Sequence, residues 1–348
     1  MNLILYFILP FIITSTLPPG RIYHTSVLKN NKIWILGGIE KPNTDSVRTC
    51  EQDASGKLAD GLWKYDIETN SWDYEDTPFP GKRGSNALIN KAGDVYVFGG
   101  GITDPRRPHY SIPVPEMWKY SKKGWAQIKI DSPPIYGQSS VINKKGHIYS
   151  LGGLNKNGRS SYLYVFDGKK WIREDTPFSL IKLKDGKPGG IMGHTMTFID
   201  KRYIYVIGGV VGFPTEKEDY NSDVWSYDTY RKKWKLLCGG VRTFGHSACL
   251  REDTVISDGL KVKDDEILVL GGFYPSNMVT NSEGAKHMDG TKNTILAFNI
   301  RTNSWKHKGN LENSREFHTS ELVDNSRIFI FGGYHIGEFW KKGEIIYI

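Results

Sequence analysis

The chain has 348 residues, of which 38 are glycine and 13% are aromatic, and its formal net charge is +8. Its three cysteines include no C-x-x-C pair, which argues against a disulfide-stapled scaffold and against a cysteine-based zinc site. The sequence contains no phosphate-binding glycine loop and no G-x-S-x-G, H-E-x-x-H or EF-hand motif, so it indicates no familiar catalytic class. The composition is typical of a turn-rich β protein, although the length alone favours two or three domains.

The first 18 residues differ from the rest of the chain because they are mostly apolar. Leu3–Ile13 is too short to span a membrane but fits the apolar core of a signal peptide. We therefore expect a signal peptide over residues 1–18, no transmembrane span, and a secreted or otherwise extracytoplasmic protein. The alternative is that Pro10–Thr14 form a strand that closes the last repeat, and the protein is then cytoplasmic.

A sixfold repeat fills residues 19–348. Pairs of glycines that follow an apolar segment recur about every 53 to 63 residues, close to the spacing of four-stranded propeller blades. The pairs are Gly37-Gly38, Gly99-Gly100, Gly152-Gly153, Gly208-Gly209, Gly271-Gly272 and Gly332-Gly333. This recurrence overrides the domain count suggested by length and predicts a single domain.

Residues 193–234 show the repeating unit most clearly. Alternating β-branched and aromatic residues between turn residues predict four strands, A to D in chain order. These strands are His194–Ile199, Tyr203–Ile207, Val224–Tyr227 and a strand that opens with Trp234. We expect each glycine pair to end strand B at a point where an aromatic side chain of strand C packs over it.

Four features of each unit identify its family resemblance. They are the R-x-x-H-(T/S) segment before strand A, the Gly-Gly end of strand B, the Tyr-Asp of strand C and the Trp of strand D. With these features the chain resembles the kelch-repeat family over about residues 20–348, which implies an all-β, six-bladed β-propeller with four antiparallel strands per blade. Tyr65, Tyr120, Tyr227 and the strand D tryptophans are then expected to fill the space between blades.

The resemblance implies a non-catalytic binding module more readily than an enzyme. We expect a monomer that binds a protein, or an acidic peptide or ligand, with no cofactor, no metal and no nucleic acid. The alternative is a secreted sugar-handling enzyme that resembles N-acetylneuraminate epimerase, a kelch-repeat propeller with an acidic sugar substrate. An acid–base pair beside a small pocket would favour the enzyme, and a broad open funnel would favour a protein partner.

The connections between strands B and C are long, and they share one face of a propeller with the D–A connections. Long loops held by a rigid scaffold are common binding elements. The candidate ligand-binding residues on these loops are Arg106, Arg107, His109, Tyr110, Tyr274, Tyr334 and His335.

Arginines recur in the D–A connections. Arg21, Arg83 and Arg315 stand three residues before the strand A histidine or its replacement, and Arg242 is displaced by one. Because their blades are adjacent in a closed ring, we expect a half-ring of guanidinium groups that binds carboxylate or phosphate. The alternative is that these arginines are framework residues, each paired with a carboxylate of a neighbouring blade.

Strand A carries His24, His194, His246 and His318, with Asn86 and Gln138 in the other two places. Because six such positions diverge around a wide channel, we expect no metal site. The turns on the opposite face carry basic pairs such as Lys122-Lys123 and Lys144-Lys145. Such pairs either solvate the turns or contact anionic polymers or lipid headgroups, and no nucleic-acid-binding motif accompanies them.

Overall fold

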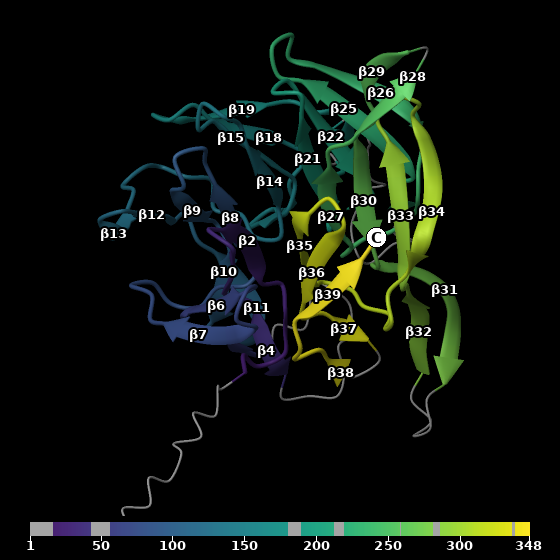
Figure 1. Ribbon diagram of the computed structural model, residues 1–348. Helices are drawn as coiled ribbons and strands as arrows, with labels where there is room; N and C mark the ends of the chain where they lie inside the picture. Colours follow the sequence, from purple (N-terminus) through teal and green to yellow (C-terminus); the bar gives the residue numbers. More distant parts are fainter. Residues whose placement is uncertain are drawn as a thin grey trace, which may run out of the picture.

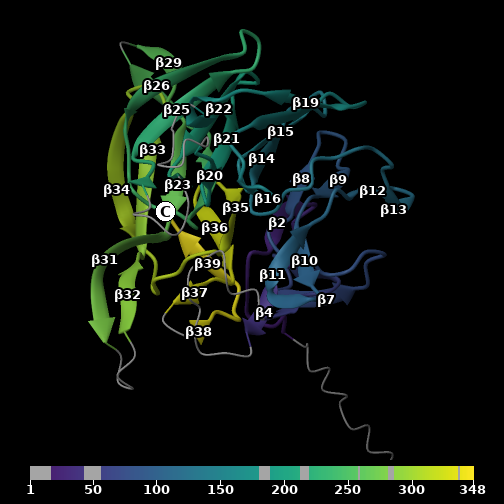
Figure 2. The same ribbon diagram turned by 180° about the vertical axis from the view of Figure 1, so that it is seen from behind.

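The computed structural model describes residues 17–42, 56–179, 189–211, 219–257, 259–280, 286–335 and 338–348. Within these ranges the chain folds into β-strands and one 3-10 turn, η1 (Pro177–Ser179) (Figures 1 and 2). None of these residues forms a helix that is long and apolar enough to cross a membrane. Pro10–Thr14, the alternative closing strand, and most of the expected signal peptide lie outside the described residues.

The predicted blades correspond to six antiparallel sheets, ordered here from the innermost strand outward. Blade 1 is β2 (Thr25–Lys29), β3 (Lys32–Leu36), β6 (Leu62–Asp66) and β7 (Ser71–Glu75). Blade 2 is β8 (Asn86–Ile89), β9 (Val95–Phe98), β12 (Met117–Ser121) and β13 (Gly124–Gln127). Blade 3 is β14 (Ser139–Ile142), β15 (Ile148–Leu151), β18 (Leu163–Phe166) and β19 (Trp171–Glu174).

The second half of the chain repeats the same order. Blade 4 is β21 (Thr195–Ile199), β22 (Tyr203–Ile207), β25 (Asp223–Asp228) and β26 (Lys233–Gly239). Blade 5 is β27 (Ser247–Arg251), β30 (Glu266–Leu270), β33 (Thr294–Asn299) and β34 (Ser304–Asn310). Blade 6 has three strands within the described residues: β35 (Thr319–Asp324), β36 (Arg327–Phe331) and β39 (Glu344–Tyr347).

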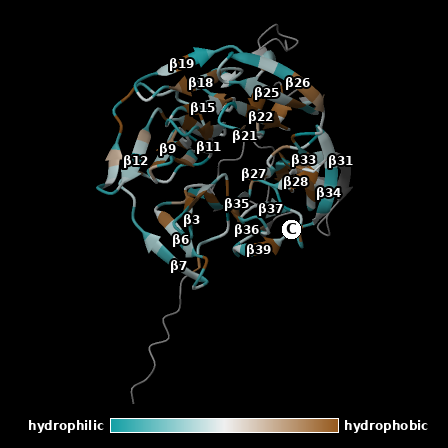
Figure 3. Ribbon diagram, turned by 45° about the horizontal axis from the view of Figure 1, so that its top comes forward, coloured by the Kyte–Doolittle hydropathy of each residue, from teal (hydrophilic) through white to brown (hydrophobic). Residues whose placement is uncertain are grey.

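The innermost strands close the six sheets into a ring. Strand β2 contacts β8 on one side and β35 on the other, and β14, β21 and β27 complete the circuit. Figure 3 shows the sheets arranged around a common centre, with β7, β12, β19, β26 and β34 towards the outside. This architecture is the β-propeller expected from the repeat, and its six sheets agree with the expected number of blades.

Beyond the glycine pairs, the B–C connections continue as short β-ribbons on one face, here called the long-loop face (lower end of Figure 1). Two of them also pair with a D–A strand: β1 (Arg21–Ile22) with β4 (Ile39–Pro42) and β5 (Gly56–Leu58), and β20 (Ile191–Met192) with β23 (Val210–Val211) and β24 (Asp219–Tyr220). The other ribbons are β10 (Gly101–Asp104) with β11 (Arg107–Pro113), β16 (Leu154–Asn155) with β17 (Gly158–Arg159), β31 (Phe273–Thr280) with β32 (Lys286–Thr291), and β37 (Tyr334–His335) with β38 (Glu338–Phe339).

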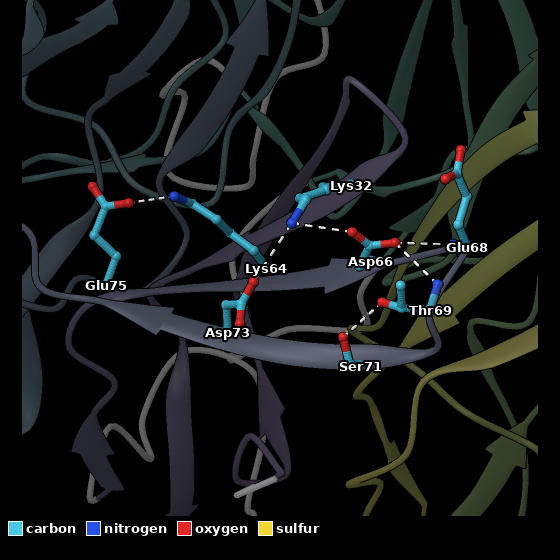
Figure 4. Close-up of polar contacts among 8 residues, drawn as sticks. All are labelled: Lys32, Lys64, Asp66, Glu68, Thr69, Ser71, Asp73 and Glu75. Carbon is cyan, nitrogen blue, oxygen red and sulfur yellow. Dashed lines mark hydrogen bonds and ion pairs between the residues drawn. The ribbon is translucent and has the colours of Figure 1, made fainter.

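The opposite face, here called the turn face, holds the A–B and C–D turns. In blade 5 the A–B connection is extended into a hairpin, β28 (Thr254–Ser257) and β29 (Leu260–Lys263), which projects at the top of Figure 1. The Asp or Asn that ends strand C shapes several C–D turns: Asp66 Oδ1 accepts hydrogen bonds from the backbone N–H groups of Glu68 and Thr69 at 3.0 and 3.1 Å (Figure 4). These bonds and Lys32 lower the pKa of Asp66.

The glycine pairs join the blades as well as ending strand B. Gly208 and Gly209 have φ values of 65° and 95°, and a Cβ on Gly209 would lie 2.8 Å from the Cβ of His194. The crowding at Gly209 therefore comes from strand A, and the expectation of a strand C aromatic over the pair is wrong there. The second glycine of every pair donates its N–H to a carbonyl of the next D–A connection. These bonds, 2.7–3.0 Å long, run from Gly38 to Lys82, Gly100 to Ile135, Gly153 to Ile191, Gly209 to Thr243, Gly272 to Arg315 and Gly333 to Arg21.

Aromatic side chains fill the space between the blades, as expected from the repeat. Tyr65 of blade 1 stacks on Phe329 of blade 6, with ring centroids 4.7 Å apart. Tyr120 of blade 2 meets Trp34 of blade 1 edge-on at 4.9 Å. Tyr227 of blade 4 lies among the buried side chains of blade 3 and donates a hydrogen bond to Glu174. The strand C tyrosine thus packs against the preceding blade each time.

Candidate functional site

The innermost strands enclose a cavity of about 570 Å³ along the propeller axis. Its wall is rich in hydroxyl, amide and imidazole groups, and the acidic side chain in the wall is Glu321. The residue two places before each innermost strand forms the rim of this cavity towards the long-loop face. The rim residues, which all have φ between 55° and 68°, are Tyr23, Gly84, Gly137, Gly193, Gly245 and Phe317.

The residues after the rim fix the register of strand A. His24, Gln138, His194, His246 and His318 each follow a rim residue, as predicted, but in blade 2 the residue after Gly84 is Ser85. The prediction that Asn86 replaces the histidine is therefore wrong by one residue. Asn86 instead occupies the next position, where its Nδ2 donates a hydrogen bond to the carbonyl of Gln138 at 2.9 Å.

Three of the four strand A histidines connect blades and are neutral. The Nε2 atoms of His24, His246 and His318 lie 2.9, 2.9 and 2.8 Å from the hydroxyl oxygens of Thr319, Thr195 and Ser247 in the preceding blades. Burial lowers the pKa of His24 and of His246 to about 3. No group of three or more potential metal ligands occurs among the described residues. These three histidines therefore act as contacts between blades.

The four arginines of the D–A connections do not share one register. Gly38 donates to the carbonyl of Lys82 in the same way that Gly333 and Gly272 donate to those of Arg21 and Arg315. Lys82 therefore stands in blade 2 where Arg21 and Arg315 stand in theirs, and Arg83 follows one residue later. The predicted common spacing is wrong because it is counted from Asn86. Arg242 precedes the corresponding residue of blade 5, Thr243, by one.

Arg21 and Arg315 are fully buried and paired with carboxylates. Arg21 Nη2 lies 3.5 Å from Glu40 Oε1, and its Nη1 donates to the carbonyl of Gly37 at 3.2 Å. Arg315 Nη2 lies 2.8 Å from Glu344 Oε1. Each carboxylate belongs to the arginine's own blade, whereas the framework alternative placed it in a neighbouring one. Burial lowers the pKa of Arg21 to about 10, which leaves the guanidinium charged at neutral pH.

Arg83 is placed differently. Its side chain is buried, its guanidinium carbon lies 5.1 Å from the ring centroid of Tyr136, and its Nε and Nη2 have no hydrogen-bond partner within the described part of the chain. Buried guanidinium nitrogens without a hydrogen-bond partner are costly. Lys82 beside it is paired with Glu116 at 2.5 Å.

Arg242 and Tyr274 form a second polar group on the long-loop face. Arg242 is exposed and its Nη1 lies 3.3 Å from the Tyr274 hydroxyl. Lys292 Nζ donates to the carbonyl of Arg242 at 3.0 Å and lies 5.5 Å from the ring centroid of Tyr274. Of the four predicted arginines, Arg242 is exposed, whereas Arg83, Arg21 and Arg315 are buried.

The remaining predicted loop residues do not gather at one place. Arg106 and Arg107 lie at the tip of the β10–β11 ribbon, where Arg107 Nε donates to Asp104 at 3.0 Å. Tyr334 is buried and packs on Phe339, with ring centroids 5.5 Å apart. Tyr110 and His109 belong to β11, but their side chains lie outside the described residues.

Sequence reasoning missed a row of aromatic side chains across the long-loop face, here called the aromatic arc. It runs through Tyr274, Tyr220, Phe244, Phe317 and Tyr23. Successive ring centroids are 5.0, 5.7, 5.6 and 4.5 Å apart. The available signal was the presence of Tyr23 and Phe317 at rim positions that are glycine in the other four blades, where a positive φ disfavours a side chain.

Known proteins resemble this chain over most of its length. Residues 56–341 match the family model described as the Attractin/LZTR1 beta-propeller. Kelch domain-containing protein 3 of Rattus norvegicus is 26% identical over 285 residues, which are 75% of this chain and 68% of that protein. The Kelch domain-containing protein 10 homolog of Drosophila melanogaster is 23% identical over 338 residues, which are 91% of this chain and 52% of that protein.

A solved structure supports the fold independently. The chain of the structure titled "Structure of YjhT" aligns with a TM-score of 0.61 and 16% identity, covering 94% of this chain and 95% of that one. At this identity the likeness concerns the fold alone. The family model covers more than half of the chain, and both relatives are named as kelch domain-containing proteins. The chain therefore belongs to the kelch-repeat β-propellers, within the Attractin/LZTR1 β-propeller family.

Proposed function

We propose that the protein is a non-catalytic kelch-type binding module that recognises a protein or peptide on its long-loop face. The observation that carries this proposal is the aromatic arc, which has Arg242 and Lys292 at its Tyr274 end. Aromatic residues and arginine are enriched at the energetically dominant positions of protein interfaces. The kelch-domain relatives support a role in protein interaction.

The charges on this face favour an acidic partner. Arg83 is buried with two guanidinium nitrogens that lack partners within the described residues, and Arg242 is exposed. A carboxylate that meets either group gains charge-assisted hydrogen bonds of about 1.5–3 kcal/mol each. We therefore propose that the ligand presents carboxylates beside apolar groups, the carboxylates towards Arg83 and Arg242 and the apolar groups towards the aromatic arc.

A peptide selection tests this proposal directly, because it requires no identified partner. The full chain is used to select binders from a random peptide library, and the affinity of the selected peptides is measured by fluorescence anisotropy. We expect peptides enriched in Asp and Glu, with binding that weakens as salt is added. Arg83→Ala and Arg242→Ala should each weaken binding by about tenfold or more. Arg83→Lys should be nearly as damaging if the contact is bidentate.

Matched variants separate recognition from folding. Lys122→Ala/Lys123→Ala removes two cations from the turn face and should leave affinity unchanged. Arg315→Ala should lower the melting temperature, because Glu344 loses its partner, while the folded fraction keeps its affinity. Full affinity in a folded Arg83→Ala/Arg242→Ala double variant would contradict the proposal.

We also propose that residues 1–18 are a signal peptide and that the protein is secreted. The apolar segment Leu3–Ile13 supports this, as does the burial of Gly20, where a Cβ would lie 2.8 Å from the carbonyl oxygen of Phe339. The folded core thus begins close to the expected cleavage point. Mass spectrometry of the secreted protein should find an N-terminus near Leu17, and an intact Met1 in cytosolic protein would contradict the proposal.

A further inference from the structure

The turn face carries exposed basic side chains, which are paired most regularly in blades 2 and 3. Three turns of blades 2 and 3 each hold a pair of exposed lysines, namely Lys122, Lys123, Lys144, Lys145, Lys169 and Lys170. Nearby carboxylates are already engaged, since Asp94 binds Lys119 and Asp167 accepts two backbone N–H groups. These six cations are spread over two blades and do not converge, so they match an extended anionic surface better than a single small anion.

Apolar side chains project from the same face on the next two blades. Tyr230 in the C–D turn of blade 4 is 67% exposed, and Ile256 and Leu260 on the β28–β29 hairpin of blade 5 are 66% and 69% exposed. Ile256 pairs with Lys261 across the hairpin, and Leu260 opens the second strand beside its tip. Large apolar residues at the tips of turns are costly in water unless another surface covers them.

Polar contacts tie these tips into one surface. Lys263 Nζ of the hairpin lies 2.6 Å from Asp200 Oδ1 in the A–B turn of blade 4. In that same turn, Arg202 Nε donates to Asp228 at 3.0 Å, and the Arg202 guanidinium lies 5.5 Å from the ring centroid of Tyr230. The hairpin of blade 5 and the C–D turn of blade 4 are thus held side by side, as their positions in Figure 1 also indicate.

We propose that the turn face binds the surface of an anionic lipid membrane. Tyr230, Ile256 and Leu260 insert at the level of the headgroups, and the lysine pairs of blades 2 and 3 lie over anionic headgroups. An apolar anchor beside spread cations is the combination that holds peripheral proteins on such membranes. Nucleic acid would match the cations but leave the three apolar tips exposed. The long-loop face then points away from the membrane and stays open to its own ligand.

Vesicle co-sedimentation tests the inference with the full chain. The probes are vesicles of phosphatidylcholine alone and of an about 3:1 mixture of phosphatidylcholine and phosphatidylserine. We expect sedimentation with the mixed vesicles and at least about tenfold weaker binding to the neutral ones, and added salt should release the protein. Absence of binding to the mixed vesicles, or equal binding to both kinds, would overturn the inference.

Two pairs of variants locate the contact. Ile256→Ser/Leu260→Ser should weaken binding to the mixed vesicles by about tenfold or more, because two apolar anchors are lost. Its control is Ile112→Ser on the long-loop face, also an exposed isoleucine, which should bind as the wild type does. Lys144→Glu/Lys145→Glu should weaken binding by about tenfold or more, whereas Lys341→Glu/Lys342→Glu, another exposed lysine pair, should have at most a small effect.

The same variants exclude the competing explanations. All four substitution sets lie on exposed side chains, so a preserved melting temperature verifies that each variant is folded. Fluorescence quenching of Tyr230→Trp by brominated lipid reports insertion directly, and no quenching by the mixed vesicles would overturn the inference. Equal loss of binding in the lysine variant and its control would also overturn it, since the attraction would then come from net charge. Peptide binding at the long-loop face should survive in Ile256→Ser/Leu260→Ser, which keeps this test separate from that of the proposed function.

Discussion

The six junctions between blades fall into two groups that share a backbone but differ in side chains. In the histidine arc, which comprises junctions 4–5, 5–6 and 6–1, a strand A histidine meets a hydroxyl of the preceding blade at 2.8–2.9 Å. In the backbone arc, which comprises junctions 1–2, 2–3 and 3–4, backbone groups take part instead. There the N–H groups of Ala87 and Met196 donate to the hydroxyls of Thr25 and Ser139, and Asn86 donates to the carbonyl of Gln138, each at 2.9 Å.

The junction between blades 3 and 4 has the histidine of one arc, His194, but the backbone hydrogen bond of the other. By its position it should meet Ser139, but that hydroxyl accepts the N–H of Met196, and neither ring nitrogen of His194 has a hydrogen-bond partner among the described residues. The main-chain bonds of the glycine pairs are the same in both arcs. The comparison teaches that the glycine pairs set the ring geometry, while the strand A side chains decide how each junction responds to pH and substitution.

The largest loss of stability is expected from substitutions in the glycine pairs, which are alike in both arcs. Gly209→Val should lower the free energy of unfolding by about 2–4 kcal/mol, because φ is +95° and the new side chain meets His194. Gly100→Val in the backbone arc should cost a similar amount, since φ there is +93°. Urea unfolding measures both. Gly239→Ala, where a Cβ would meet nothing within 4 Å, is the control, and an unchanged melting temperature for Gly209→Val would refute this account of the pairs.

The next largest loss of stability should differ between the two arcs. His318→Ala removes the contact with Ser247 and a buried ring, and should cost about 2–3 kcal/mol. Gln138→Ala, at the matching position of the backbone arc, should cost about 1 kcal/mol or less, because the Gln138 side-chain oxygen has no partner among the described residues. Chemical denaturation with an unchanged m-value tests this. Equal losses would mean that the two arcs do not differ in strength.

Acid should weaken the histidine arc in particular. The folded-state pKa of His24 and His246 is about 3, below the ordinary value of 6.5, so the unfolded chain takes up protons first as the pH falls. The contribution of these histidines to the free energy of unfolding is fully present above about pH 6.5. Below that pH, it should fall by about 1.4 kcal/mol per pH unit for each buried histidine. Unfolding curves at pH 7 and pH 5 measure this slope. His246→Gln should reduce it, and a slope that His246→Gln leaves unchanged would show that His246 is not responsible.

The smallest effect concerns the 6–1 junction, where Glu321 Oε1 accepts a hydrogen bond from Ser26 at 2.6 Å. Burial raises the pKa of Glu321 to about 7, so its contribution to stability is present below about pH 4.5 and is lost as the pH rises through 7. Glu321→Gln should remove this loss and so gain about 1 kcal/mol relative to the wild type between pH 5 and pH 8. If the free energies of unfolding of the wild type and Glu321→Gln change in parallel with pH, the loss of stability does not come from Glu321.

The fold followed from the sequence because its signals are local and repeated. Each glycine pair, strand A segment and strand C Tyr-Asp occurs several times, so one ambiguous copy does not change the prediction. The register of blade 2 did not follow, because Ser85 replaces histidine and the neighbouring Asn86 is the more conspicuous polar residue. The rim glycine, Gly84, was the better reference, since its φ of 59° matches that of the other rim residues.

The candidate site was less predictable because its members meet only when the ring closes. Tyr274 and Arg242 were identified as loop residues, but nothing local in the sequence places Tyr220 and Phe317 in the same aromatic row. The burial of Arg21 and Arg315 depends on Glu40 and Glu344, which reach them through sheet pairing. The burial and the partners of a side chain depend on the tertiary structure, which a repeat motif does not specify residue by residue.

The hydrogen bond from Gly333 to the carbonyl of Arg21 joins blade 6 to the segment before blade 1, and this has a consequence for biosynthesis. A ribosome completes the acceptor long before the donor emerges, so blade 1 waits for its second neighbour until blade 6 has been made. During that interval the apolar side of blade 1 that later covers Phe329 and Phe331 is open to other nascent chains. Closure across such a sequence separation is entropically slow, so we expect the joining of blade 6 to blade 1 to be a late step of folding.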